Sequence, residues 1–126
     1  MKKSFKKLLV LGLSTALVTG SALTVFAESY TVRGNAGSTV FTGAVYAEPY
    51  SAGAYMSTDE VADLYIKDGY TRTYWGEEFT FSSTNEQSTY TAASNRSSTN
   101  YIYTEANFSV SSNDGGYNKV YANVSR

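Results

Sequence analysis

Apolar and polar residues alternate most regularly over the last quarter of the chain, which predicts two antiparallel strands. One strand is expected over 102–110 and the other over 120–124. Because residues two apart in a strand share a face, each strand has one apolar side that predicts burial against a core. These apolar sides consist of Ile102, Thr104, Ala106, Phe108 and Val110 in the first strand and of Val120, Ala122 and Val124 in the second.

The two apolar sides also predict the register of this hairpin. Placing Phe108 opposite Val120 requires paired residue numbers that sum to an even value. A two-residue loop gives an odd sum and would place Val110 opposite Lys119. A three-residue loop, Asn113-Asp114-Gly115, gives the even sum and puts its glycine where a positive φ is needed. A five-residue loop of the same parity is the alternative.

Shorter strands are expected earlier in the chain, separated by loops rich in Ser, Thr and Asn. The segment 39–47 is apolar on both faces, so it suits the inside of a sandwich, and Pro49 ends it because proline cannot donate to a ladder. The other expected strands are 30–33, 70–75, 78–82 and 90–93.

The segment 51–67 permits two interpretations. Ser57 and Glu60 form a capping box, which predicts a short helix near 58–66. The residues 57–60 can equally form the turn of a hairpin between 52–56 and 61–67, with Ala62, Leu64 and Ile66 facing the core. We favour the hairpin because the surrounding chain consists of strand segments.

The composition supports an all-β fold. Tyrosine occurs twelve times, and Leu64 is the only leucine after residue 27, which favours pleated sheet over a helical bundle. Cysteine is absent, so the apolar core and the backbone hydrogen bonds must hold the fold. We therefore predict one domain over 28–126, a small antiparallel β-sandwich or small barrel of about six to eight strands.

The first 27 residues have the three parts of a secretory signal peptide. A cluster of four lysines precedes an apolar run, and Val25 and Ala27 are small enough for a signal peptidase site. We predict cleavage after Ala27, a mature chain that begins at Glu28, and a secreted or loosely envelope-associated protein without a stable membrane anchor. The alternative is an uncleaved anchor, because the run is nearly long enough to span a bilayer. The signal is similar to those of Gram-positive bacteria, and the whole chain is similar in character to their small cysteine-free secreted β proteins.

Charge and residue content exclude several classes of function. Residues 28–126 carry six basic and eleven acidic side chains, a net charge of about −5, which disfavours nucleic acid and anionic lipid. Histidine and cysteine are absent, which excludes Ser-His-Asp and Cys-His catalysis and the usual zinc sites. No cofactor is expected, and we predict that the protein is not an enzyme. The acids Asp59, Glu60 and Asp63 could gather around a cation, but a charged turn is the favoured interpretation.

The tyrosines are the most suggestive candidates for a binding site. Tyr101, Tyr103 and Tyr121 fall on the outward side of the last hairpin, where they could stack on a glycan or anchor a cell-surface protein. The alternative is that they only pack across strands. Trp75 is predicted to be a core residue. We therefore expect a non-enzymatic binding module, with a bacteriocin-like effector acting on envelope precursors or membranes as the alternative.

Overall fold

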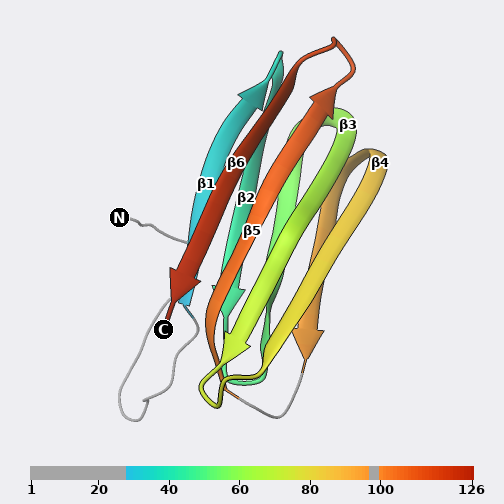
Figure 1. The fold of residues 1–126 in the computed structure, drawn as a ribbon. Coiled ribbons are helices and arrows are strands. Elements are labelled where there is room, and N and C mark those ends of the chain that lie inside the picture. The colour runs from blue at the N-terminus through green and yellow to red at the C-terminus, as the bar shows by residue number, and fades with distance from the viewer. Residues whose placement is uncertain (1–27, 97–99) are drawn as a thin grey trace.

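The computed structural model describes residues 28–96 and 100–126, which form six strands and no helix (Figure 1). The predicted all-β class is therefore confirmed, and the short helix near 58–66, the alternative interpretation of that segment, is not formed. The predicted signal peptide, residues 1–27, lies outside the described residues. The strands are β1 (Glu28–Ala36), β2 (Thr39–Ala47), β3 (Ser51–Thr73), β4 (Glu78–Arg96), β5 (Tyr101–Ser112) and β6 (Tyr117–Ser125).

Two of the strands, β3 and β4, belong to both layers of the structure. Residues 52–58 of β3 pair with β2, whereas residues 62–73 pair with β5. Strand β4 pairs with β3 along both halves. Figure 1 shows that β3 and β4 each bend back at the same end of the molecule. One hydrogen-bonded sheet, ordered β1-β2-β3-β5-β6 with β4 on β3, therefore forms both layers.

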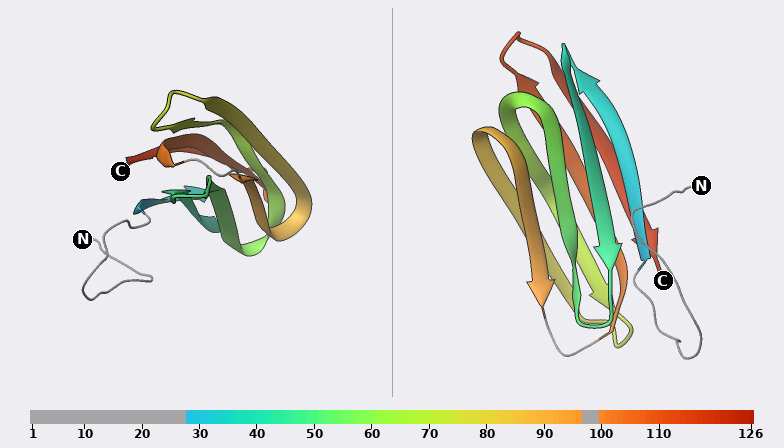
Figure 2. Two further views of the ribbon diagram at one scale, coloured as in Figure 1. Left: turned by 90° about the horizontal axis from the view of Figure 1, so that it is seen from below. Right: turned by 180° about the vertical axis from the view of Figure 1, so that it is seen from behind.

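The sandwich is nearly closed into a barrel, as Figures 1 and 2 show. We call β1, β2 and the adjoining halves of β3 and β4 the first layer, and β5, β6 and the other halves the second layer. Strands β1 and β6 lie side by side along one side of the molecule. Strand β4 lies along the opposite side, where it pairs with β3 alone. The prediction of an antiparallel sandwich or small barrel is thus confirmed.

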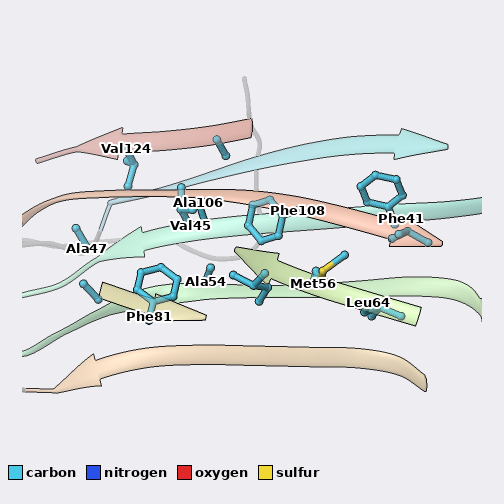
Figure 3. Close-up of a cluster of buried hydrophobic side chains, with 14 of the residues drawn as sticks. Phe41, Val45, Ala47, Ala54, Met56, Leu64, Phe81, Ala106, Phe108 and Val124 are labelled. Carbon is cyan, nitrogen blue, oxygen red and sulfur yellow. The ribbon is translucent and has the colours of Figure 1, made fainter. Parts of the chain in front are cut away.

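The hairpin predicted over 51–67 is correct in its turn and wrong in its pairing. The chain bends back near residues 57–60, but the two arms pair with β2 and β5 instead of with each other. The predicted core residues on the second arm, Ala62, Leu64 and Ile66, are fully buried. Because both arms carry an apolar side, they face each other across the core, as Met56 and Leu64 do in Figure 3.

The predicted loop between 82 and 90 is also strand. Polar residues such as Ser83 and Thr84 continue β4 because they pair with Ile66 and Tyr65 of β3. The bend of β4 lies at Gln87, whose φ of 48° takes the strand out of its extended conformation. Strand β1 likewise continues past its predicted end at residue 33 to Ala36.

The core is thin because small residues let the two layers approach closely. Phe108 lies near the middle of the core and Phe41 toward its bent end, among aliphatic side chains (Figure 3). A Cβ at Gly43 of β2 would lie only 2.6 Å from the Phe108 ring of β5, so this glycine makes room for the ring. Buried alanines line the remaining interior: Ala36, Ala47, Ala52, Ala54, Ala62, Ala106 and Ala122.

The last hairpin has the predicted register. Phe108 pairs with Val120, and Val110 pairs with Asn118 and not with Lys119. The ladder continues to the bond from the Ser112 N–H to the Gly116 carbonyl, 2.8 Å long, which leaves a three-residue loop over 113–115. The glycine at its end has the expected positive φ, 92° at Gly115.

Asp114 joins this loop to the turn between β1 and β2. Its carboxylate accepts the backbone N–H of Gly116 at 2.9 Å and that of Ser38 at 2.8 Å. The two turns are in such close contact that a Cβ at Gly37 would clash with the Asp114 carboxylate. The N–H donors hold the pKa of the Asp114 carboxyl at about 2, below its ordinary value of 3.8, because they stabilise the charged form.

The three neighbouring acids predicted to form a charged turn bind two other parts of the bent end. Asp59 accepts the backbone N–H of Val40 at 2.9 Å, and Asp63 accepts that of Gln87 at 2.9 Å. Glu60 accepts the hydroxyl of Ser38 at 3.1 Å. These side chains therefore tie the β1–β2 turn and the bend of β4 to the bend of β3.

We expect the substitution Gly43→Ala to lower the free energy of unfolding by about 1–3 kcal/mol, because the added methyl overlaps the Phe108 ring. Alanine normally suits a strand better than glycine, so the sign is diagnostic. Urea denaturation measures the change. The loss should shrink in a Phe108→Leu background. A Gly43→Ala protein as stable as the wild type would contradict the close approach of β2 and β5.

We expect Asp114→Asn to remove a pH-dependent part of the stability. The folded-state pKa of about 2 lies below the ordinary 3.8, so this stabilisation is present above pH 4 and is lost as the pH falls toward 2. Denaturation of both proteins between pH 2 and 7 tests this. The stability difference between them should be largest near neutrality and shrink on acidification. A difference independent of pH would show that the Asp114 charge is irrelevant.

Candidate ligand-binding face

The outer surface of the second layer brings aromatic, acidic and amide side chains together. Tyr70 of β3 lies opposite Glu105 of β5, which lies opposite Asn123 of β6. In the neighbouring row Arg72 lies opposite Tyr103. The side chains of these residues point away from the core because their neighbours in β5, such as Thr104 and Ala106, are buried. We define the tyrosine face as Tyr70, Arg72, Tyr103, Glu105, Tyr121 and Asn123.

Glu105 fixes the two predicted tyrosines of this face. The hydroxyls of Tyr103 and Tyr121 both donate to its Oε1 atom, at 2.7 and 2.9 Å, and lie 3.3 Å from each other. Asn123 Nδ2 donates to the Tyr121 hydroxyl at 3.3 Å. The structure therefore brings Tyr103 and Tyr121 together as predicted, and it adds a carboxylate that orients both rings.

The Tyr103 ring also has neighbours on its other side. The Arg72 guanidinium lies 5.3 Å from the ring centroid, within the range of a cation–π contact. The Tyr70 ring meets it edge-on at 6.1 Å, and the Tyr70 hydroxyl donates to Glu78 at 2.8 Å. Every aromatic ring of the face is thus positioned by a carboxylate.

The protonation of Tyr103 is fixed by the same contacts. Burial raises the pKa of the Tyr103 phenol, and the hydrogen bond to the Glu105 carboxylate raises it further, because an ionised phenol could not donate to a carboxylate. Tyr103 is consequently a neutral donor at physiological pH. The face offers hydrogen-bond donors, acceptors and ring surfaces.

The third predicted residue, Tyr101, does not belong to this face. Arg72 pairs with Tyr103 and Thr73 with Tyr101, so Ile102 is an extra residue in β5. Such a bulge shifts the alternation by one position. Tyr101 therefore points inward, is fully buried and packs against Phe79 at a ring distance of 6.0 Å. Its hydroxyl has no hydrogen-bond partner in the described residues.

Trp75 was predicted to be a core residue, and this prediction is wrong. It lies in the turn between β3 and β4 and is 74% exposed. The ring of its neighbour Tyr74, also exposed, meets it edge-on at 5.1 Å with an interplanar angle of 86°. The signal in the sequence is the glycine that follows Trp75, because glycine is common in turns. In the structure this residue, Gly76, has the positive φ of a turn, 90°. A turn at this glycine excludes Trp75 from the interior.

The first layer carries a separate pair of tyrosines on its outer surface. The rings of Tyr46 and Tyr55 lie 6.3 Å apart, and burial raises the pKa of each phenol. Tyr55 pairs with Ala44 and Ala92, so no carboxylate or guanidinium flanks it in its cross-strand row. This pair therefore provides an exposed aromatic surface for comparison with the tyrosine face.

The acidic residues do not assemble a metal centre in the part of the chain that the structure describes. Glu77 and Glu78, adjacent in sequence, have different partners. The Thr73 hydroxyl lies 3.5 Å from the Glu77 carboxylate, and Glu78 accepts from Tyr70. The acids of this surface thus serve as hydrogen-bond acceptors for hydroxyl groups.

Comparisons with known proteins add no assignment. No protein-family model, curated protein or solved structure matches the chain. Within residues 28–96 and 100–126, none of the structure forms a helix with the length and apolar character needed to cross a membrane.

Proposed function

We propose that this protein is a small exported, non-enzymatic binding module whose ligand lies on the tyrosine face. The observation that carries the proposal is the shared acceptor Glu105, on which the hydroxyls of Tyr103 and Tyr121 converge. Tyr121 is 48% exposed, so its ring remains available to a ligand. Exposed tyrosines with fixed hydroxyls combine contact area with few rotatable bonds.

The rigidity of the face supports binding in a second way. Tyr70, Tyr103 and Tyr121 lie on three adjacent strands, β3, β5 and β6, that are paired throughout this region. A surface that is already ordered loses little side-chain entropy when a ligand binds. Catalysis has no comparable support, because the chain contains no histidine and no cysteine. The acids of the face already accept hydrogen bonds from tyrosines.

Export is the second part of the proposal, and it rests on the sequence of residues 1–27. We expect expression of the full chain in a bacterial host to release a soluble species that begins at Glu28. Intact mass measurement of the medium and of the envelope fraction checks this. The variant Ala27→Trp, too large for a signal peptidase site, should stay unprocessed. A full-length wild-type protein in the envelope fraction would show that the segment is an anchor.

We expect Tyr121→Ala and Tyr103→Ala to weaken binding of a ligand at least ten-fold, because each removes one ring and one of the two hydroxyls on Glu105. Immobilised panels of glycans and of purified cell-surface proteins identify a ligand of the wild type, and calorimetry measures its affinity. Tyr55→Ala is the matched control, since Tyr55 is a comparably exposed tyrosine of the first layer.

The comparison separates this face from the rest of the surface. Equal binding by Tyr55→Ala and the wild type, with loss in the Tyr121 variant, supports the proposal. Loss in the Tyr55 variant alone would move the site to the first layer. Undiminished binding by both Tyr121→Ala and Tyr103→Ala would overturn the proposal that the ligand lies on the tyrosine face. Circular dichroism of each variant establishes that the sheet is retained.

A further inference from the structure

The exposed turn between β3 and β4 continues the tyrosine face at one end of the molecule. Strand β3 carries Tyr70 and Arg72 and ends at Thr73, and Tyr74 and Trp75 follow directly. We call Tyr74 and Trp75 the aromatic tip. A tryptophan with most of its surface in water is unusual for a structural residue, because its burial would stabilise the fold. This exposure calls for a function.

The aromatic tip is held by the backbone around it. The Thr73 N–H donates to the Glu77 carbonyl at 2.9 Å, and the Gly76 N–H donates to the Thr73 carbonyl at 3.0 Å. The Tyr74 N–H donates to the carbonyl of Asn100 at 2.7 Å, which links the turn to the start of β5. The two rings are perpendicular to each other, so the tip presents two aromatic surfaces on a backbone that is already ordered.

Two carboxylates and one guanidinium, that of Arg72, lie among the rings of the tyrosine face. Glu105 accepts from Tyr103 and Tyr121, and Glu78 accepts from Tyr70. This arrangement repels nucleic acid and anionic lipid. It also differs from the centre of a protein–protein interface, which is depleted of Glu and Asp. An uncharged ligand with many hydroxyl donors fits it, since each carboxylate can accept from hydroxyls while each ring meets an apolar face.

The extent of the surface sets the size of that ligand. Tyr121, Tyr103 and Tyr70 span three adjacent strands at a spacing of roughly 4.8 Å. Tyr121 lies at the level of Asn107 and Thr73 at the level of Tyr101, about six residues along β5 at roughly 3.3 Å per residue, and Trp75 lies in the turn beyond Thr73. The rings are therefore spread over on the order of 20 Å. A single sugar would cover only one or two of them, whereas an extended chain of sugars would reach them all.

We propose that the ligand is an uncharged, extended polysaccharide that runs along the tyrosine face and stacks on Trp75 at the aromatic tip. This inference rests on the proposed function and names its ligand class and its far end. The apolar C–H faces of pyranose rings would lie on the tyrosine and tryptophan rings. The sugar hydroxyls would donate to Glu105 and Glu78.

Trp75 itself provides the test, because it is the only tryptophan in the chain. Cellohexaose and chitohexaose are titrated into the full chain while tryptophan emission is recorded. At least one of them should give a saturable blue shift, because stacking removes water from the indole. Glucose and N-acetylglucosamine should bind at least ten-fold more weakly than the hexasaccharide. Phosphatidylcholine vesicles, with and without phosphatidylglycerol, should give no shift.

Calorimetry with the same hexasaccharide tests whether the bound sugar chain reaches the aromatic tip. Trp75→Ala is expected to weaken binding about ten-fold, by analogy with the loss of other stacking platforms. Tyr117→Ala is the matched control and should bind like the wild type, because Tyr117 is an exposed tyrosine at the start of β6, beside the bent end of the sandwich. Tyr121→Ala should also weaken binding.

The outcomes separate this inference from the proposed function. Hexasaccharide binding that requires Tyr121 but leaves Trp75 emission and the Trp75→Ala affinity unchanged would overturn the inference and leave the proposed function standing. A blue shift of tryptophan emission with vesicles and none with sugars would show that the tip binds a membrane surface. That result would overturn the inference. A protein ligand of the tyrosine face, with no response to either hexasaccharide, would also overturn it.

Discussion

Carboxylates that accept backbone N–H groups hold together the end of the sandwich where β3 and β4 bend. A sheet that folds over itself leaves backbone N–H groups at its turns without a partner in the ladders, and a carboxylate is a strong acceptor for such donors. Asp59, Asp63 and Asp114 each accept one of these donors, on Val40, Gln87 and Ser38. In a chain with no cysteine and a thin core, these contacts fix how the four turns and bends meet. The two layers keep their relative position as a result.

The thin core also explains where the aromatic residues are found. Alanine and glycine line much of the interior, and Gly43 brings β2 against the Phe108 ring. The large side chains buried among them are mostly apolar, such as Phe41, Phe108 and Met56. Tyr101 is the tyrosine that is fully buried, and many of the others lie on the outer surfaces. Side chains alternate between the two sides of a strand, so a tyrosine that is not buried in the core lies on the outer side of the sheet. The tyrosine face is therefore a consequence of the same packing that brings the layers together.

The sequence was sufficient where the determining interaction is local. The even sum of the paired residue numbers and the glycine of the loop predicted the last hairpin, with Phe108 opposite Val120. Both signals depend only on residues of the two strands and of the loop between them. The sequence was insufficient where pairing with a strand distant along the chain determines the structure. Alternation showed that Leu64 faces the core, but it could not show that the segment before it crosses to the other layer. Tyr101 was misplaced because the bulge at Ile102 is set by pairing with β3, which no local pattern records.

The course of β3 through both layers has a consequence for how the protein folds and opens. Residues 52–58 complete the ladder with β2, and residues 62–73 complete the ladder with β5, within one continuous strand. A separable sandwich could lose one sheet while the other stays intact. Here the two ladders share one strand, so we expect the opening of one ladder to weaken the other. The molecule should therefore unfold as a single cooperative unit. Its folding should be slow, because it requires pairing between strands that are distant along the chain.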